Sequence, residues 1–257
     1  METVLKAENL RKTFGAVTAA DGISAAIEKD SVVGLIGTNG AGKTTFINMI
    51  TGYLKPDEGA IHYEGRDITR LQPRDITRLG ICRSFQIPQL YASLSVEENM
   101  LVALGVVLRN AGKGGFFSGS SPEVPGHGAP AEAVAERLLA SFGLGDYRAK
   151  NAQVLPGGVR KLLDIALTMA AKPKVLLLDE PTSGVSAEEK FGVMDRVMAA
   201  VKAQGATVLF VEHDMEVVAR FAERVLAFYE GRIIADAAPK DALANHDVQR
   251  YVVGIHA

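Results

Sequence analysis

A glycine-rich segment near the N-terminus constrains the fold of this 257-residue chain more than any other feature. Residues 37–45 read Gly-Thr-Asn-Gly-Ala-Gly-Lys-Thr-Thr and match the pattern G-x-x-x-x-G-K-[ST]. An apolar run over residues 31–36 precedes the segment, and a helical pattern over residues 43–51, closed by Gly52, follows it. A strand, a glycine-rich loop and a helix in this order predict an α/β fold with a phosphate-binding loop after a buried parallel strand.

The residue types of this loop explain how it would bind phosphate. Glycines allow successive backbone N–H groups to point into one concavity, and the N-terminus of the following helix adds partial positive charge. The Lys43 ammonium can reach the β- and γ-phosphates of a nucleotide, and the Thr44 hydroxyl can coordinate Mg²⁺. The expected phosphate-binding residues are Gly37, Asn39, Gly40, Ala41, Gly42, Lys43, Thr44 and Thr45.

Two adjacent carboxylates follow a second apolar run, which covers residues 175–178. At the end of this predicted strand, Asp179 can face Mg²⁺ directly or through water, and Glu180 can polarise an attacking water molecule. Adjacent acids beyond a buried strand are rarely structural, because removing them from water needs compensation. The pair therefore predicts a metal-dependent hydrolytic site beside the phosphate-binding loop.

Strand and helix patterns alternate through much of the chain. A third apolar run covers residues 207–211, and helical patterns cover residues 159–171 and 187–202. Ser186 and Glu189 predict a capping box at the start of the second of these helices. This alternation predicts a mostly parallel sheet that is covered on both faces by helices.

Other segments depart from this plan. Residues 1–30 and 60–70 show short alternating runs broken by turns, which predict an antiparallel edge. The middle of the chain is mainly helical, and Ser95 and Glu98 predict another capping box there. Residues 110–130 contain 6 Gly, 3 Pro and 3 Ser in 21 positions, so we expect a flexible loop.

Composition excludes several classes of protein. With 28 Lys and Arg against 30 Asp and Glu, the net charge of −2 argues against bulk nucleic-acid binding. Cys82 is alone, so the chain has neither an internal disulfide framework nor a cysteine zinc cluster. The longest apolar run, residues 100–108, is far shorter than the roughly 20 residues of a membrane helix. We expect a protein without a signal peptide in a reducing cytoplasm.

With these residues in view, nearly the whole chain resembles the ATP-binding subunit of ABC transporters. The resemblance implies ATP and Mg²⁺ as cofactors, an adenine-stacking ring at Phe14 and apolar support from Val17. It implies that Gln86 contacts Mg²⁺ and water and senses the membrane partner, and that His213 contacts the γ-phosphate. The implied catalytic residues are Glu180, His213, Gln86 and Lys43. The implied metal ligands are Thr44, Gln86 and Asp179.

Within that family, the chain looks most like the longer of the two ATPases in branched-chain amino acid importers. Residues 50–59, 65–69, 80–86 and 231–235 carry this narrower resemblance, together with the enlarged helical insert. It implies uptake of branched-chain or related amino acids, driven by ATP-dependent closure of two ATPase subunits. A non-transport ABC ATPase, another P-loop enzyme such as a small-molecule kinase, and an ATP-sensing module remain as alternatives.

The sequence departs from the family at its diagnostic Leu-Ser-Gly-Gly-Gln stretch. In the family this stretch contacts the γ-phosphate bound by the other subunit, which implies that role for Pro156, Gly157 and Gly158. Pro156 lacks the serine hydroxyl and Val159 lacks the glutamine amide. Losing a hydrogen bond of about 1.5–3 kcal/mol could slow that composite site roughly ten- to a hundredfold. A harmless subfamily variation is the other interpretation, and Ser186 likewise replaces a frequent Asp or Asn.

We therefore expect one ABC ATPase domain over residues 1–257, with a P-loop NTPase core, a mostly parallel sheet and an antiparallel β edge. Residues 1–87 and 172–257 would form that core, and residues 88–171 a helical subdomain that includes loop 110–130. The expected partners are a second, different ABC ATPase subunit, two permease subunits that contact residues 86–94, and indirectly a periplasmic solute-binding protein. No nucleic acid is expected, and the subunit would lie at the cytoplasmic face of the inner membrane.

Overall fold

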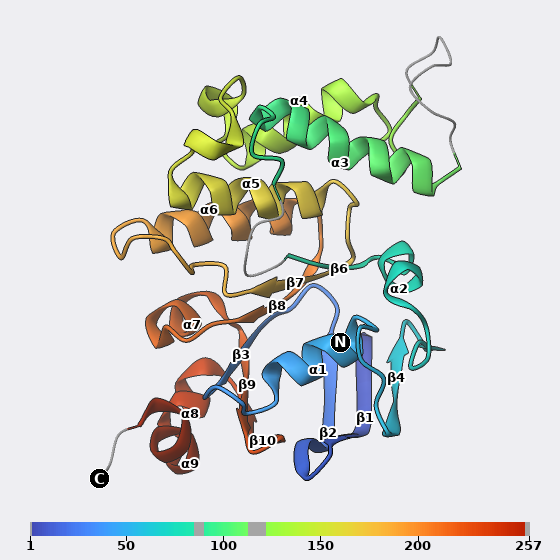
Figure 1. The fold of residues 1–257 in the computed structure, drawn as a ribbon. Helices are drawn as coiled ribbons and strands as arrows, with labels where there is room; N and C mark the ends of the chain where they lie inside the picture. Colours follow the sequence, from blue (N-terminus) through green and yellow to red (C-terminus); the bar gives the residue numbers. More distant parts are fainter. Residues whose placement is uncertain (1, 85–89, 113–121, 255–257) are drawn as a thin grey trace. The chain divides into compact units, whose positions relative to one another are not determined.

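A computed structural model describes residues 2–84, 90–112 and 122–254 of the chain (Figure 1). Contacts divide the chain into two compact units. The first unit comprises Met1–Arg83, Val175–Glu180 and Ala206–Ala257, and the second comprises Ser84–Lys174 and Pro181–Gly205. Residues 181–205 were expected in the core but belong to the second unit, because α6 (Lys190–Ala203) packs against α4 (Ala131–Ser141) and α5 (Gly157–Met169).

The first unit contains two β-sheets. The six-stranded sheet has the order β10-β9-β3-β8-β7-β6, and the four-stranded sheet has the order β2-β1-β4-β5. The strands of the six-stranded sheet are β3 (Val32–Gly37), β6 (Ile81–Arg83), β7 (Val175–Asp179), β8 (Thr207–Val211), β9 (Arg224–Tyr229) and β10 (Arg232–Ala237). Those of the four-stranded sheet are β1 (Thr3–Phe14), β2 (Val17–Glu28), β4 (Glu58–Tyr63) and β5 (Arg66–Asp67). The expected strands near residues 31–36, 175–178 and 207–211 are therefore confirmed.

Strand direction decides where polar side chains gather. Strands β6, β7, β8, β3 and β9 run parallel to one another, whereas the edge strand β10 is antiparallel to β9. The carboxyl ends of parallel strands meet at one edge of a sheet, where ligands of open α/β sheets bind. The four-stranded sheet is antiparallel throughout, which confirms the antiparallel edge predicted from residues 1–30 and 60–70.

Helices of the first unit connect and cover these strands. They are α1 (Lys43–Ile50), α2 (Pro73–Leu79), α7 (Met215–Phe221), α8 (Pro239–Ala244) and α9 (His246–Val248), followed by a π-helical turn over Gln249–Val253. One hydrophobic cluster joins α1 to both sheets, with Phe46 of α1, Leu10 of β1 and Leu177 of β7 all fully buried. Because Ala41 of the loop and Phe46 of α1 belong to this cluster, packing holds the start of α1 against the strands of both sheets.

The second unit is mainly helical. It contains α3 (Val96–Asn110), α4, α5 and α6, with short 3₁₀ helices at Gly145–Tyr147 and Ala152–Val154. The predicted capping box is confirmed, since Glu98 N–H donates to Ser95 Oγ at 3.2 Å and Ser95 N–H donates to Glu98 Oε2 at 2.7 Å. Within the described part of the chain, every helix falls short of the length and hydrophobicity that a bilayer span requires.

The capping box predicted for α6 is wrong. Helix α6 begins at Lys190, and its N-cap residue Glu189 has no side-chain capping bond within the described part of the chain. The Ser186 hydroxyl instead donates to Glu189 Oε2 at 3.1 Å, and the backbone between them forms a turn. The two side chains therefore satisfy one another rather than the backbone N–H groups of the helix.

Candidate nucleotide site

The glycine-rich loop links the end of β3 to the start of α1, and its shape depends on residues without a Cβ atom. Gly42 is the N-cap of α1 and has a φ of 108°. A Cβ atom on Gly42 would lie 2.8 Å from the Ala19 carbonyl oxygen, and one on Gly37 would lie 2.5 Å from the Phe228 carbonyl oxygen. Both neighbours are backbone atoms, so only glycine fits at these two positions without displacing a strand.

Replacing Gly42 with Ala is expected to destabilise the nucleotide-free protein more than replacing Gly40 with Ala. Both positions have a positive φ, but among described atoms only the Gly42 replacement brings its Cβ within 4 Å of other groups. The strain of a positive φ, about 1–2 kcal/mol, is common to both variants, whereas overpacking adds about 1–3 kcal/mol in Gly42→Ala. Urea unfolding of the two variants measures this difference, and equal midpoints would contradict the packing argument.

Lys43 is the buried cation of the loop. Its side chain donates from Nζ to the carbonyl oxygens of Gly37 at 2.6 Å and Thr38 at 3.0 Å. Burial lowers the pKa of Lys43 from its usual value, whereas the charges of Glu180 and Asp179 act in the opposite direction. The ammonium therefore lies inside the loop, in the electrostatic field of the two acids that end β7.

The two predicted acids lie at the carboxyl end of β7, beside the ends of β6 and β8. Asp179 Oδ2 accepts a hydrogen bond from Arg83 Nη2 at 2.5 Å, and Arg83 Nη1 donates to Asn48 Oδ1 in α1 at 2.6 Å. Asn48 is one helical turn beyond Thr44, so Arg83 joins the Asp179 carboxylate to α1, the helix that follows the glycine-rich loop. The sequence motifs gave no role to Arg83, although a basic residue at the end of the strand that pairs with β7 is a usable signal.

Glu180 and His213 meet although they follow different strands. Their side chains approach at 3.2 Å between Glu180 Oε1 and His213 Nε2. Glu180 adopts a positive φ of 48°, and its backbone N–H donates to the Val211 carbonyl oxygen at 3.0 Å, which joins the ends of β7 and β8. The structure thus brings together two of the residues expected to act on the terminal phosphate and attacking water.

The turn between β1 and β2 presents the candidate adenine platform. Phe14 ends β1 and Val17 begins β2, and these residues are 52% and 64% exposed. Large apolar side chains at such exposure are available to stack on a base. The Lys12 ammonium lies 5.7 Å from the Phe14 ring centroid.

Two groups of predicted residues are not among those that the structure brings together at this site. Gln86 falls outside the described residues, as do residues 87–89 of the expected permease contact. Pro156, Gly157 and Gly158 belong to the second unit, where Pro156 is the N-cap of α5. A Cβ atom on Gly157 would lie 2.6 Å from the Gly184 carbonyl oxygen, so close packing inside this unit is sufficient reason for glycine at this position.

Oxygen donors suit the expected metal. Among the described residues, no group of three or more His, Cys, Asp or Glu side chains could hold a metal ion. Mg²⁺ is usually bound by one or two protein oxygen ligands together with water and substrate phosphates. The Thr44 hydroxyl and the Asp179 carboxylate are donors of this kind, so the residues present fit a magnesium ion that arrives with a nucleotide.

The sequence of this chain matches a known family model and two named relatives along most of its length. A family model described as "ABC transporter" matches residues 20–183. The probable branched-chain amino acid transport ATP-binding protein LivG of Archaeoglobus fulgidus is 35% identical over 251 residues, covering 98% of this chain and 95% of that protein. The high-affinity branched-chain amino acid transport ATP-binding protein BraF of Pseudomonas aeruginosa is 31% identical, covering 98% of each chain.

The fold of this chain is also similar to solved structures of ATP-binding cassettes from ABC transporters. An ATP-binding cassette of an ABC transporter in its ADP conformation superposes with a TM-score of 0.82 at 30% identity, covering 99% of this chain and 100% of that one. A nucleotide-free ATP-binding cassette from an ABC transporter has a TM-score of 0.80 at the same identity.

Proposed function

Because the chain belongs to the ABC transporter family as an ATP-binding cassette, we propose that it powers the import of branched-chain or related amino acids. ATP hydrolysis is the activity of this family. The observation that carries the proposed substrate class is 31–35% identity, along nearly the whole chain, to ATP-binding proteins named for branched-chain amino acid transport. Because the ATP-binding subunit does not touch the solute, its own site residues do not select the amino acid.

The contacts of the described site residues support the following proposed roles. Lys43 and the loop N–H groups would bind the β- and γ-phosphates, and Thr44 and Asp179 would hold Mg²⁺, which would neutralise phosphate charge. Glu180 accepts a proton from the attacking water, since this residue directly follows β7 and its charge acts on the Lys43 ammonium of the loop. His213, whose Nε2 lies 3.2 Å from Glu180 Oε1, orients that carboxylate and approaches the γ-phosphate.

The transport proposal is tested by reconstitution. The chain, two permease subunits and a second ATPase are inserted into lipid vesicles together with a periplasmic binding protein. Vesicles supplied with ATP should accumulate labelled leucine, and a non-hydrolysable ATP analogue should prevent uptake. ATP hydrolysis that does not respond to the leucine-loaded binding protein would contradict the importer assignment.

The partner ATPase is proposed to be a different chain. The groups that this chain offers to its own nucleotide include Lys43, Asp179, Glu180 and His213, whereas Pro156 replaces the serine that would serve the partner's nucleotide. We expect the nucleotide held by this chain to be hydrolysed faster than the one held by its partner. Labelled nucleotide trapped at each site reports the two rates, and equal rates would contradict this asymmetry.

A further inference from the structure

The end of the β1–β2 hairpin extends beyond the rest of its sheet. Pairing between β1 and β4 ends at Arg11 and Glu58, whereas pairing between β1 and β2 continues to Phe14 and Val17. The register also shifts between Lys12 and Thr13. A two-stranded hairpin is marginally stable by itself, so the position of Phe14 needs support from outside the β1–β2 ladder.

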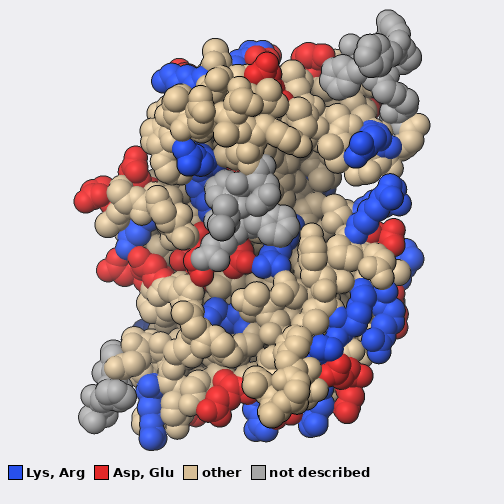
Figure 2. Space-filling view, viewed as in Figure 1, with Lys and Arg blue, Asp and Glu red and all other residues tan. Residues whose placement is uncertain are grey.

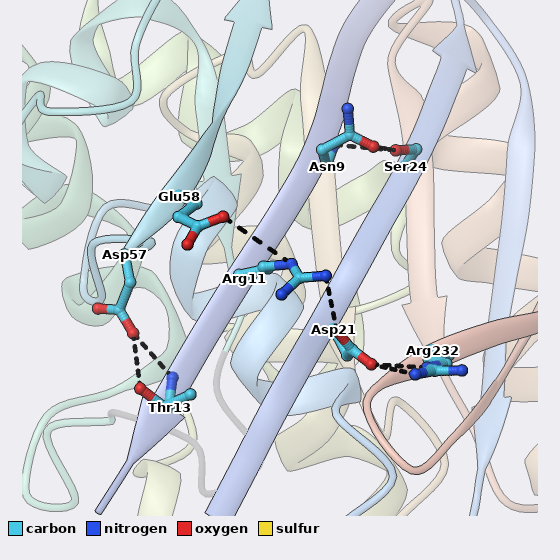
Figure 3. A network of polar contacts seen from close by, with 8 residues as sticks. All are labelled: Asn9, Arg11, Thr13, Asp21, Ser24, Asp57, Glu58 and Arg232. Atoms are coloured by element: carbon cyan, nitrogen blue, oxygen red, sulfur yellow. Dashed lines mark hydrogen bonds and ion pairs between the residues drawn. The ribbon is translucent and has the colours of Figure 1, made fainter.

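Asp57, which directly precedes β4, supports the end of the hairpin through several hydrogen bonds. Its Oδ2 accepts hydrogen bonds from the Thr13 N–H at 2.8 Å and the Thr13 hydroxyl at 3.1 Å, and its Oδ1 accepts from Lys12 Nζ at 2.6 Å (Figure 3 draws the Thr13 bonds). The Asp57 N–H donates to the Arg11 carbonyl oxygen at 2.8 Å. Asp57 therefore extends the attachment of β1 to β4 by two residues, up to the neighbour of Phe14.

The same carboxylate also places a cation against the candidate adenine platform. Lys12, whose side chain is 17% exposed, bonds to Asp57 while its ammonium lies 5.7 Å from the centre of the Phe14 ring. Hydrogen bonds from Lys12 and Thr13 lower the pKa of Asp57 to about 2, so the carboxylate is charged at neutral pH. Asp57 thus acts on the ring through the backbone of Thr13 and through the side chain of Lys12.

The neighbouring residue Glu58 forms an ion pair of its own and can be compared with Asp57. In Figure 3, Arg232 bonds to Asp21, Asp21 pairs with Arg11, and Arg11 pairs with Glu58, so this chain of charges crosses the sheet farther from the hairpin turn. Glu58 is adjacent to Asp57 in sequence, and its carboxylate lies 3.9 Å from Arg11 Nε. It therefore carries the same charge in nearly the same place without the bonds to residues 12 and 13 that Asp57 makes.

We propose that Asp57 is a positioning residue that holds Phe14 in place to stack on the adenine of ATP. This inference rests on the proposed role of Phe14 in nucleotide binding. Stacking of a base on an aromatic side chain accounts for about 5- to 150-fold in affinity, and a ring that samples many positions loses part of that gain. We expect Asp57→Ala to weaken ATP binding about five- to tenfold and to leave the binding of inorganic triphosphate, which has no base, within about twofold.

Calorimetric titration of the full chain with Mg-ATP and with Mg-triphosphate tests the proposal. Phe14→Ala and Asp57→Ala should both weaken ATP binding selectively, Asp57→Asn should have a smaller effect in the same direction, and Glu58→Gln should match the wild type. If Phe14→Ala leaves ATP binding unchanged, the proposed adenine platform is wrong. If Phe14→Ala weakens ATP binding but Asp57→Ala does not, or if Asp57→Ala weakens both ligands equally, the positioning role is wrong.

A spectroscopic measurement reports the position of the ring without any ligand. The chain has no Trp, so Phe14→Trp introduces a single indole at the platform. In this background, adding Asp57→Ala should lower the fluorescence anisotropy of the indole, whereas adding Glu58→Gln should leave it unchanged. An anisotropy that does not respond to Asp57→Ala would overturn the proposal independently of nucleotide binding.

Discussion

Replacing Glu180 with Gln is expected to lower ATP turnover by about 10²- to 10⁴-fold while ATP still binds. Gln keeps the size of the side chain but cannot accept the proton of an attacking water molecule. The hydrogen-bonding contact between residue 180 and His213 Nε2, 3.2 Å in the wild type, can persist through the amide. Steady-state phosphate release measures turnover, and calorimetry with Mg-ATP measures binding.

A matched control separates the role of Glu180 from a general effect of charge. Glu188→Gln removes the same charge from an exposed side chain in the second unit and should leave turnover unchanged. Unchanged turnover in Glu180→Gln would show that another group accepts the proton, and loss of ATP binding would show that Glu180 supports the structure of the site. The wild-type rate also discriminates between an ATPase and an ATP-sensing module, because a sensor would bind ATP without turnover.

Replacing Arg83 with Met is expected to destabilise the nucleotide-free protein by about 3–5 kcal/mol. The side chains of Arg83 and Asp179 are 10% and 16% exposed, so their ion pair is largely shielded from water. Met fills a similar volume but removes the guanidinium charge, 2.5 Å from Asp179 Oδ2, that compensates much of the desolvation of the Asp179 carboxylate. Urea unfolding at 25 °C measures the free energy of unfolding.

The double variant Arg83→Met/Asp179→Asn tests the physical cause. If the cost arises from an uncompensated buried charge, the neutral Asn should restore part of the lost stability. Arg232→Met is the control, because Arg232 is 68% exposed in its pair with Asp21 and an exposed pair contributes little. A double variant that recovers none of the stability lost in Arg83→Met would show that Arg83 stabilises the fold through packing rather than through charge.

Charge on the surface is consistent with the near-balanced composition. Lys and Arg side chains and Asp and Glu side chains both occur on the face shown in Figure 2, with uncharged surface between them. The polar contacts that organise the nucleotide site are few and individually placed, as in the bonds that Arg83 makes to Asn48 and Asp179. Net charge is therefore a poor guide to how this chain would bind a polyanion such as ATP.

Local patterns predicted much of the fold because their physical causes act over a few residues. Strand β8 covers the predicted residues 207–211, and α5 lies within two residues of the predicted helix 159–171. The phosphate loop was also predictable, because the spacing of its glycines and the position of Lys43 are local. The predicted capping box at Ser186 failed, since a serine and a glutamate at the correct spacing can also bond to each other.

The sequence by itself determined the phosphate loop, the acids after β7 and the alternation of strands and helices. Only the tertiary structure decided which distant residues meet: Arg83 pairs with Asp179 across 96 positions, Asp57 holds Thr13 across 44, and His213 reaches Glu180 across 33. These contacts depend on strand order and on the packing of α1 against both sheets. The periodicity of a segment reports which of its faces is buried, whereas its partners are selected by the chain as a whole.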